Sequence, residues 1–208
     1  MQFIFPLILI GALGLGVIIL TWLGLSQRRR GRNLARLAYQ IDMRFSASDP
    51  FNLVKRYFAF VLFQAGHSPR ARNVIYGRFK GWHLKVFDYQ FEVGHGTHRS
   101  TRRYSVISAD TDFQMPNVLL WNVENNEYVP AVLHKPDGQI DGWYILGEVD
   151  LAETLAATLR TLAKDGIDAE TAGGTVMIYS REPGKPSQLG DRIIRFTDAL
   201  ANLKERLN

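Results

Sequence analysis

An unbroken apolar run near the start of the chain constrains this protein more than any other feature. Residues 3–25 contain no charged side chain. A helix of that length spans roughly 34 Å, which is enough for the roughly 30 Å hydrocarbon core of a bilayer. Because lipid offers no hydrogen-bonding partner to backbone groups, a single apolar segment of this kind crosses as a helix. The run predicts a transmembrane anchor within residues 1–25.

The charges beside the run predict its orientation. No basic residue precedes it, whereas Arg28, Arg29, Arg30, Arg32 and Arg36 follow it. A cleaved signal peptide has basic residues before a shorter apolar stretch, so a retained anchor fits better. Since Lys and Arg favour the cytoplasmic side, we expect the N-terminus outside and the C-terminal domain in the cytoplasm. The protein is then a single-pass protein of the inner (plasma) membrane, with the lipid bilayer as one partner.

The rest of the chain is patterned for one cytosolic α+β domain with an antiparallel sheet and packed helices. Residues 26–48 form a basic juxtamembrane segment, and the domain is expected over residues 49–208. Apolar spacing predicts helices over residues 51–64, between Asp150 as a cap and Gly166 as a stop, and over residues 189–207. Runs of β-branched and aromatic residues predict strands over 73–79, 82–93, 102–109, 117–123 and 140–148, and a hairpin that turns at Gly173-Gly174.

Composition excludes several kinds of site. The 208 residues include no cysteine, which rules out disulfides, thiolate-bound metals and a cysteine nucleophile. Residues 26–110 hold 16 Lys and Arg against 5 Asp and Glu, whereas residues 111–208 hold 9 against 15. Because anionic lipid attracts basic groups, we expect the basic part to face the membrane. No nucleic-acid partner is expected, since no recognition helix or ribonucleoprotein motif accompanies this charge.

A histidine pair is the best candidate for a metal site. His95 and His98 lie in a glycine-containing turn, with His83 and Asp88 nearby in the sequence. Imidazole and carboxylate are ligands that zinc prefers. Two histidines on a hairpin turn need not converge, however, and exposure to solvent is the more ordinary outcome. No cofactor is expected elsewhere in the chain.

Arginines give a candidate anion site at two places. Arg99, Arg102 and Arg103 follow the glycine turn, and arginine binds phosphate through two parallel hydrogen bonds. A second cluster follows the apolar run, where anionic lipid is the expected ligand, and it includes Arg28, Arg29, Arg30 and Arg32. A plainer interpretation of the first cluster is a basic loop exposed to solvent. A plainer interpretation of the second is a group of charges that only sets the orientation of the chain in the membrane.

Asp88 lies between Phe87 and Tyr89 in the strongest strand pattern. We expect it to pair with Arg78 or Lys80 on the adjacent strand, and a buried acid that stays protonated is the alternative. Serine, histidine and aspartate are all present in the chain, but no G-x-S-x-G elbow supports a hydrolase triad.

Three short motifs occur in the strand-rich part of the chain: Tyr76-Gly77-Arg78 and Gly81 followed by Val86-Phe87-Asp88-Tyr89, then Tyr144-Ile145-Leu146-Gly147-Glu148, then Gly173-Gly174-Thr175-Val176-Met177-Ile178-Tyr179. In this pattern the chain resembles a family of uncharacterised, single-pass, membrane-anchored bacterial proteins over residues 73–203. The family's Leu-Pro segment is Met115-Pro116 here. The resemblance implies a cytosolic α+β fold and membrane anchoring. It implies no catalytic residue, because the family has no assigned activity.

The sequence favours a non-enzymatic membrane protein whose cytosolic domain binds a protein partner or helps to assemble a membrane complex. One alternative is a membrane-tethered, metal-assisted hydrolase that uses His95 and His98. The other is a sensor of anionic lipid or of a phosphate ligand that uses the arginine clusters. An enzyme is the less favoured class.

Overall fold

The computed structural model describes residues 13–16, 28–124, 135–163, 165–181, 184 and 186–207. Most of the apolar run over residues 3–25 lies outside these residues, and the part described, residues 13–16, is helical. Among the residues described, no helix is long and apolar enough to cross a membrane. The membrane anchor over residues 1–25 therefore stays a prediction.

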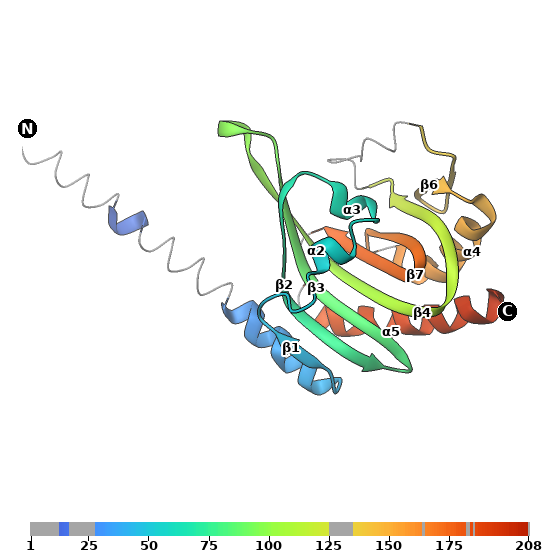
Figure 1. The fold of residues 1–208 in the computed structure, drawn as a ribbon, viewed down its shortest axis with the longest axis horizontal. Coiled ribbons are helices and arrows are strands. Elements are labelled where there is room, and N and C mark those ends of the chain that lie inside the picture. Colours follow the sequence, from blue (N-terminus) through green and yellow to red (C-terminus); the bar gives the residue numbers. More distant parts are fainter. Residues whose placement is uncertain are drawn as a thin grey trace, which may run out of the picture.

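The centre of the fold is an antiparallel sheet with helices on both faces (Figure 1). Its strands are β1 (Arg44–Ser46), β2 (His67–Phe79), β3 (Trp82–Val93), β4 (Ser100–Asn122), β5 (Gly138–Ile140), β6 (Trp143–Gly147) and β7 (Ile167–Arg181). The helices are helix 28–40, α2 (Leu53–Arg56), α3 (Val61–Gln64), α4 (Val149–Ala163) and α5 (Pro186–Leu207), with a short 3-10 turn, η1 (Gly96–His98), before β4. The α+β class expected from the sequence is confirmed.

β4 organises the sheet because it pairs along both of its edges. From Ser100 to Asp110 it pairs with β3, and from Val118 to Asn122 it pairs with β6. β7 runs antiparallel along the other edge, opposite residues 104–120 of β4. β1 and β2 extend the sheet beyond β3, and β5 extends it beyond β6.

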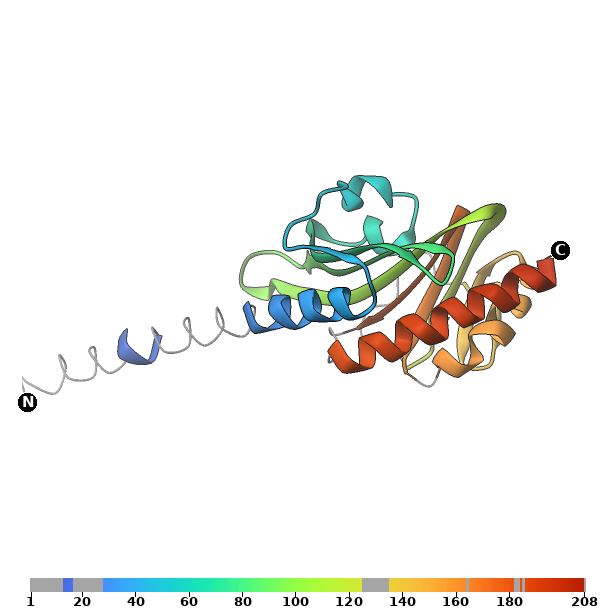
Figure 2. The same ribbon diagram turned by 90° about the horizontal axis from the view of Figure 1, so that it is seen from below.

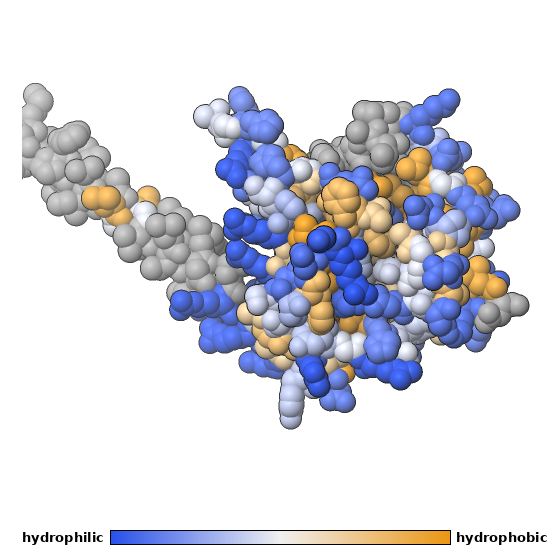
Figure 3. Space-filling view, in the orientation of Figure 1, coloured by the Kyte–Doolittle hydropathy of each residue, from blue (hydrophilic) through white to orange (hydrophobic). Residues whose placement is uncertain are grey.

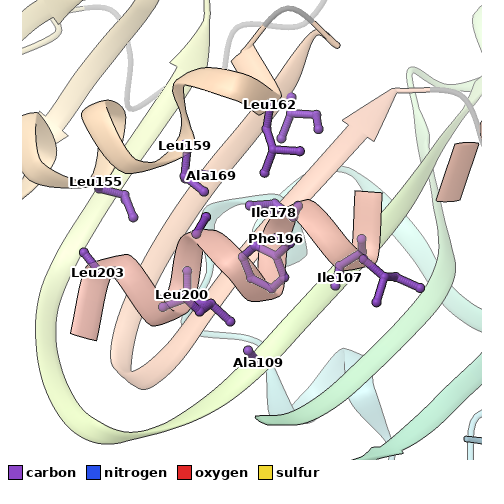
Figure 4. Close-up of a cluster of buried hydrophobic side chains, with 14 of the residues drawn as sticks. Ile107, Ala109, Leu155, Leu159, Leu162, Ala169, Ile178, Phe196, Leu200 and Leu203 are labelled. Carbon is purple, nitrogen blue, oxygen red and sulfur yellow. The ribbon is translucent and has the colours of Figure 1, made fainter. Parts of the chain in front are cut away.

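Two hydrophobic cores lie on the two faces of this sheet. Helix 28–40, α4 and α5 cover one face, whereas α2 and α3 lie over the other (Figure 2). In the first core α4 and α5 pack together over β4 and β7 (Figure 4), through residues that include Leu155, Leu159, Leu162, Phe196 and Leu200. The second core is largely aromatic and includes Tyr57, Phe60, Phe63, Phe87, Tyr89, Phe91 and Tyr104. Burial on both faces explains why apolar residues occupy both alternating sets of β3.

The single helix expected over residues 51–64 is wrong. The structure has two short helices, α2 and α3, separated by a turn over residues 57–60. Leu53, Tyr57 and Phe60 are buried, and so are Leu62 and Phe63. These five positions do not share one face of a regular helix, so the segment bends to bring all of them against the sheet.

Three expected strand boundaries are also wrong. The hairpin expected at Gly173-Gly174 is one continuous strand, β7, and the strands expected over residues 102–109 and 117–123 are parts of β4. The strand expected over residues 140–148 is a hairpin, β5–β6, that turns at Asp141-Gly142. The helices expected on either side of β7 are confirmed, although α4 begins at Val149, so Asp150 lies in its first turn instead of capping it.

Thr171 shows why β7 continues through its glycine pair. The register between β4 and β7 shifts twice between Asp110 and Val118, opposite Gly173. Pro116 has no N–H for the ladder, and here the Thr171 hydroxyl donates to the Pro116 carbonyl oxygen (2.7 Å) and accepts from the Val118 N–H (3.2 Å). Both strands bend together at this irregular stretch, and no turn forms.

Residues 28–48 belong to the same packed unit as the rest of the domain. Leu34, Leu37 and Ala38 are buried in the first core, and β1 pairs with β2. The basic segment therefore packs against residues 49–208, over which the domain is expected.

A buried acid of β7, Glu170, holds α3 onto the sheet. Its carboxyl group accepts hydrogen bonds from the backbone N–H groups of Val61 (2.6 Å) and Leu62, and from the Tyr179 hydroxyl (3.4 Å). Burial raises the pKa of Glu170 to about 8, and these hydrogen bonds offset only part of that effect. Glu170 is therefore largely protonated at neutral pH in the folded protein.

We expect Glu170→Gln to remove a pH dependence of stability. The pKa of Glu170 is about 8 in the folded protein, against an ordinary 4.5. The contribution of its protonated carboxyl group to the free energy of unfolding is therefore full below pH 4.5 and is lost as the pH rises through 8. Relative to the variant, the wild-type protein should lose on the order of 4 kcal/mol between about pH 5 and pH 9 in urea unfolding. Parallel stability curves for the two proteins would contradict this assignment.

Candidate functional site

A basic groove of about 710 Å³ opens between helix 28–40, β1 and β2. The groove is lined by Arg28, Gly31, Arg32, Ala35, Phe45, Ala47, Arg72 and Asn73. Three of these eight residues are positively charged and none is acidic. On the face shown in Figure 3, hydrophilic residues gather around the start of helix 28–40, whereas apolar residues gather toward the centre, over α2 and α3.

The helical repeat sorts the residues of helix 28–40 onto three faces. The face that lines the groove carries Arg28, Gly31, Arg32 and Ala35. The face turned toward the sheet carries Arg30, Leu34, Leu37 and Ala38. The remaining face is exposed and carries Arg29 and Arg36. Arginines that are neighbours in the sequence therefore have different surroundings.

Arg30 anchors the helix to Asp88 of β3. Its Nε and Nη2 donate to the two carboxylate oxygens at 2.7 and 2.6 Å, and its Nη1 donates to the carbonyl oxygen of Gly184 at 2.9 Å. Asn73 Nδ2 donates to the same carboxylate at 2.8 Å. Both charged side chains are only 17% exposed. A bidentate and partly buried pair of this kind is screened less, and held more firmly, than a surface ion pair.

The pairing of Asp88 with Arg78 or Lys80, expected from the sequence, is wrong. Asp88 continues the face of β3 that carries Leu84, and helix 28–40 covers that face. Lys80 pairs with Asp198 of α5 instead, at 2.7 Å. The true partner of Asp88 lies 58 residues away in the sequence, where no local pattern could identify it.

Asn73 shapes the wall of the groove. It has a φ of 53° at a register shift in β2, and its N–H donates to the Ala47 carbonyl oxygen at 3.1 Å. A Cβ added at Gly31 would lie 3.3 Å from Asn73 Oδ1, so the glycine lets the helix approach β2 this closely. Backbone contacts therefore fix the shape of the groove together with the Arg30–Asp88 pair.

Two other pockets are lined by both signs of charge. One, of about 680 Å³, lies between the β2–β3 turn and α5 and contains Lys204, which pairs with Asp112 at 2.6 Å. The other, of about 330 Å³, contains Arg195, which pairs with Asp165. The basic groove differs from both because its lining includes cations and no anion.

His95 and His98, the expected metal ligands, are exposed at the β3–β4 turn. The ring of His95 stacks on that of His67 with centroids 5.2 Å apart. Asp88 is bound to helix 28–40, and His83 lies at the opposite end of β3. Among the residues that the structure describes, no three His, Asp or Glu side chains are grouped to hold a metal ion. The metal site therefore stays a prediction.

The arginines of the β3–β4 turn do not line the basic groove. Arg99 Nε donates to Glu92 Oε2 at 2.6 Å, and this hydrogen bond lowers the pKa of the Glu92 carboxyl. Arg102 is half-buried and Arg103 is exposed. The two arginine clusters proposed from the sequence therefore do not form one pocket.

Sequence reasoning missed Phe45, Arg72 and Asn73 as residues of the groove. Arg72 lies just before the strand expected over residues 73–79, whereas β2 already begins at His67. Only the pairing of β1 with β2, in which Phe45 lies opposite Ile75, brings these side chains beside helix 28–40.

Comparison with known proteins shows a shared fold. No family model and no curated protein matches the chain. The structure is similar to the crystal structure of the mycobacterial trehalose monomycolate transport factor A, TtfA, with a TM-score of 0.57 over 85% of this chain and 92% of that chain. The two sequences are 15% identical, so the likeness concerns the fold alone. The similarity to a membrane-anchored bacterial family remains a resemblance.

We expect Asp88→Asn to loosen helix 28–40. The change leaves the Arg30 guanidinium partly buried without its charged partner, which should lower the free energy of unfolding by about 1–3 kcal/mol. Hydrogen exchange should rise in helix 28–40 before it rises in β3. Asp198→Asn is the control, because its pair with Lys80 is exposed and contributes under about 1 kcal/mol. Equal effects of the two changes would refute the anchoring role of Asp88.

Proposed function

We propose that this protein is a non-enzymatic, single-pass membrane protein whose cytosolic domain binds a protein partner and helps to assemble a membrane complex. The observation that carries the proposal is the short link between the apolar run and the packed domain. The run ends at Leu25, and helix 28–40 is held on the sheet by Arg30. Three residues of chain reach about 10 Å at most, so insertion of the run would hold the domain at the membrane surface.

The placement of the perturbed acids supports binding over catalysis. Burial raises the pKa of Glu170 to about 8 and the pKa of Tyr57 to about 12. Glu170 lies beneath the α2–α3 segment (residues 51–64), and Tyr57 belongs to that segment with its side chain buried. Neither residue lines any of the three pockets described above. Catalytic acids and bases with shifted pKa values usually line a cleft that a substrate can enter.

The structural neighbour supports the same class of function. It is named as a transport factor, and its fold spans most of this chain. A fold by itself does not fix a function, so the likeness only agrees with the proposal. The positive charges after the apolar run favour a cytoplasmic domain and an external N-terminus.

The segment over the second core offers a surface for a protein partner. Phe58 is 64% exposed and Phe51 is 37% exposed. Phe51 contacts the ring of Tyr76 edge-on, with centroids 4.8 Å apart. Aromatic side chains are enriched at protein interfaces, where they bury a large apolar area. We therefore place the contact with the partner at the α2–α3 segment.

Cross-linking in cells, followed by purification of the full chain in mild detergent, tests this function. We expect one membrane protein to be recovered in stoichiometric amount. Phe58→Glu should reduce its recovery about tenfold, as for the loss of a central interface aromatic residue. Ile194→Glu is the matched control, because Ile194 is 41% exposed on α5, on the other face of the sheet.

A second variant separates the contribution of the membrane anchor to partner binding from that of the domain. Replacement of residues 3–25 by an unrelated single membrane helix should keep the partner, since the domain makes the contact. A full chain recovered alone, or recovered without detergent in the soluble fraction, would contradict the proposed function.

A further inference from the structure

Three arginines of the basic groove have no acidic partner among the described residues. Arg28, Arg32 and Arg72 are exposed at the groove, whereas Arg30 and Arg195 are each paired with an aspartate. Like charges gathered around one pocket repel one another. A bound anion would relieve this repulsion, so the charge of the groove favours an anionic ligand.

The acid nearest to the groove does not oppose an anion strongly. Asp88 accepts two hydrogen bonds from Arg30 and one from Asn73, so its charge is already compensated. These bonds also hold the helix in place before any ligand arrives. A site that is already formed avoids part of the ordering cost of binding.

The groove combines its charge with an apolar wall. Ala35, Phe45 and Ala47 line it together with the arginines. Guanidinium groups bind phosphate oxygens through paired hydrogen bonds, and apolar side chains favour contact with methylene groups. A pocket of about 710 Å³ is also much larger than an inorganic phosphate ion. The matching ligand carries a phosphate next to a hydrocarbon part.

The position of Arg28 in the chain places the groove near lipid headgroups. Arg28 follows Leu25, the end of the apolar run, by three residues, a reach of about 10 Å at most. The polar layer of a bilayer extends roughly 5–8 Å beyond the hydrocarbon core on each side. An inserted run therefore holds the groove at the level of the lipid phosphates.

We propose that the basic groove binds the phosphate-bearing headgroup of an anionic phospholipid. Arg28 and Arg32 from the helix and Arg72 from β2 bind the phosphate, and Phe45 contacts the first methylene groups of the lipid. The proposal rests on the membrane tether of the proposed function and names a ligand for the surface of the domain that the tether holds at the bilayer.

Native mass spectrometry of the full chain in dodecyl maltoside tests the groove. The probes are dioleoylphosphatidylglycerol, dioleoylphosphatidylcholine and glycerol 3-phosphate, which is a headgroup without hydrocarbon. The groove variant is Arg28→Gln/Arg32→Gln/Arg72→Gln. The control removes the same charge from exposed arginines that do not line the groove, and it is Arg29→Gln/Arg36→Gln/Arg44→Gln.

We expect phosphatidylglycerol to bind at least about tenfold more tightly than phosphatidylcholine. The groove variant should lose about tenfold in affinity for phosphatidylglycerol, and the control less than about threefold. Equal losses in the two variants would overturn the groove and leave only general attraction to basic residues. Displacement of the lipid by an equal concentration of glycerol 3-phosphate would overturn the lipid as ligand.

Two features keep the result interpretable. Thermal unfolding of both variants checks their folding, and Arg72→Gln against Arg44→Gln gives the same comparison if the triple variant does not fold. The assay uses isolated protein, so failure to recover a protein partner in cells leaves this result unchanged. If the full chain binds the lipid but is recovered in the soluble fraction without detergent, the membrane anchor is refuted and the lipid site of the groove is not.

Discussion

The ion pair between Arg30 and Asp88 determines where the basic end of this chain lies. A helix has 3.6 residues per turn, so turning Arg30 toward β3 turns Arg28 and Arg32 toward the groove and Arg29 toward solvent. Leu34 and Leu37 follow Arg30 on the same face and enter the first core. One partly buried pair thus couples the packing of the helix to the exposure of its other arginines.

The start and the end of the domain meet at this pair. Arg30 also donates to the Gly184 carbonyl oxygen, just before α5, and a Cβ added at Gly190 of α5 would lie 3.3 Å from Leu37. The β4–β7 pair makes this arrangement possible, because it carries α4 and α5 on the face of the sheet that helix 28–40 also covers. The opposite face is closed by α2 and α3, which leaves Phe58 exposed.

Long periodic elements were predictable from the sequence, whereas the segments and side chains that they contact were not. The leucine stripes of α4 and α5 and the alternation of β3 identify buried faces because burial imposes a period. Gly173-Gly174 looks like a turn locally, and Gly173 has a φ of 57°, but pairing with β4 and the hydroxyl of Thr171 keep the glycine pair within β7. For the groove, the sequence indicated Arg28 and Arg32 but grouped them with Arg30, and only the sheet register supplies Arg72. Alternation shows which side chains share a face and not what covers that face.

The measurement that most directly tests whether the groove faces the bilayer is fluorescence quenching in nanodiscs. The chain has no cysteine, so Ser48→Cys beside the groove and Ala157→Cys on α4 each accept one label. α4 lies at the end of the sheet far from helix 28–40 (Figure 1). Both positions are exposed. Phosphatidylglycerol nanodiscs that carry headgroup-spin-labelled lipid should quench the label at position 48 strongly and the label at position 157 weakly. Equal quenching, or stronger quenching at position 157, would contradict a groove held at the lipid surface.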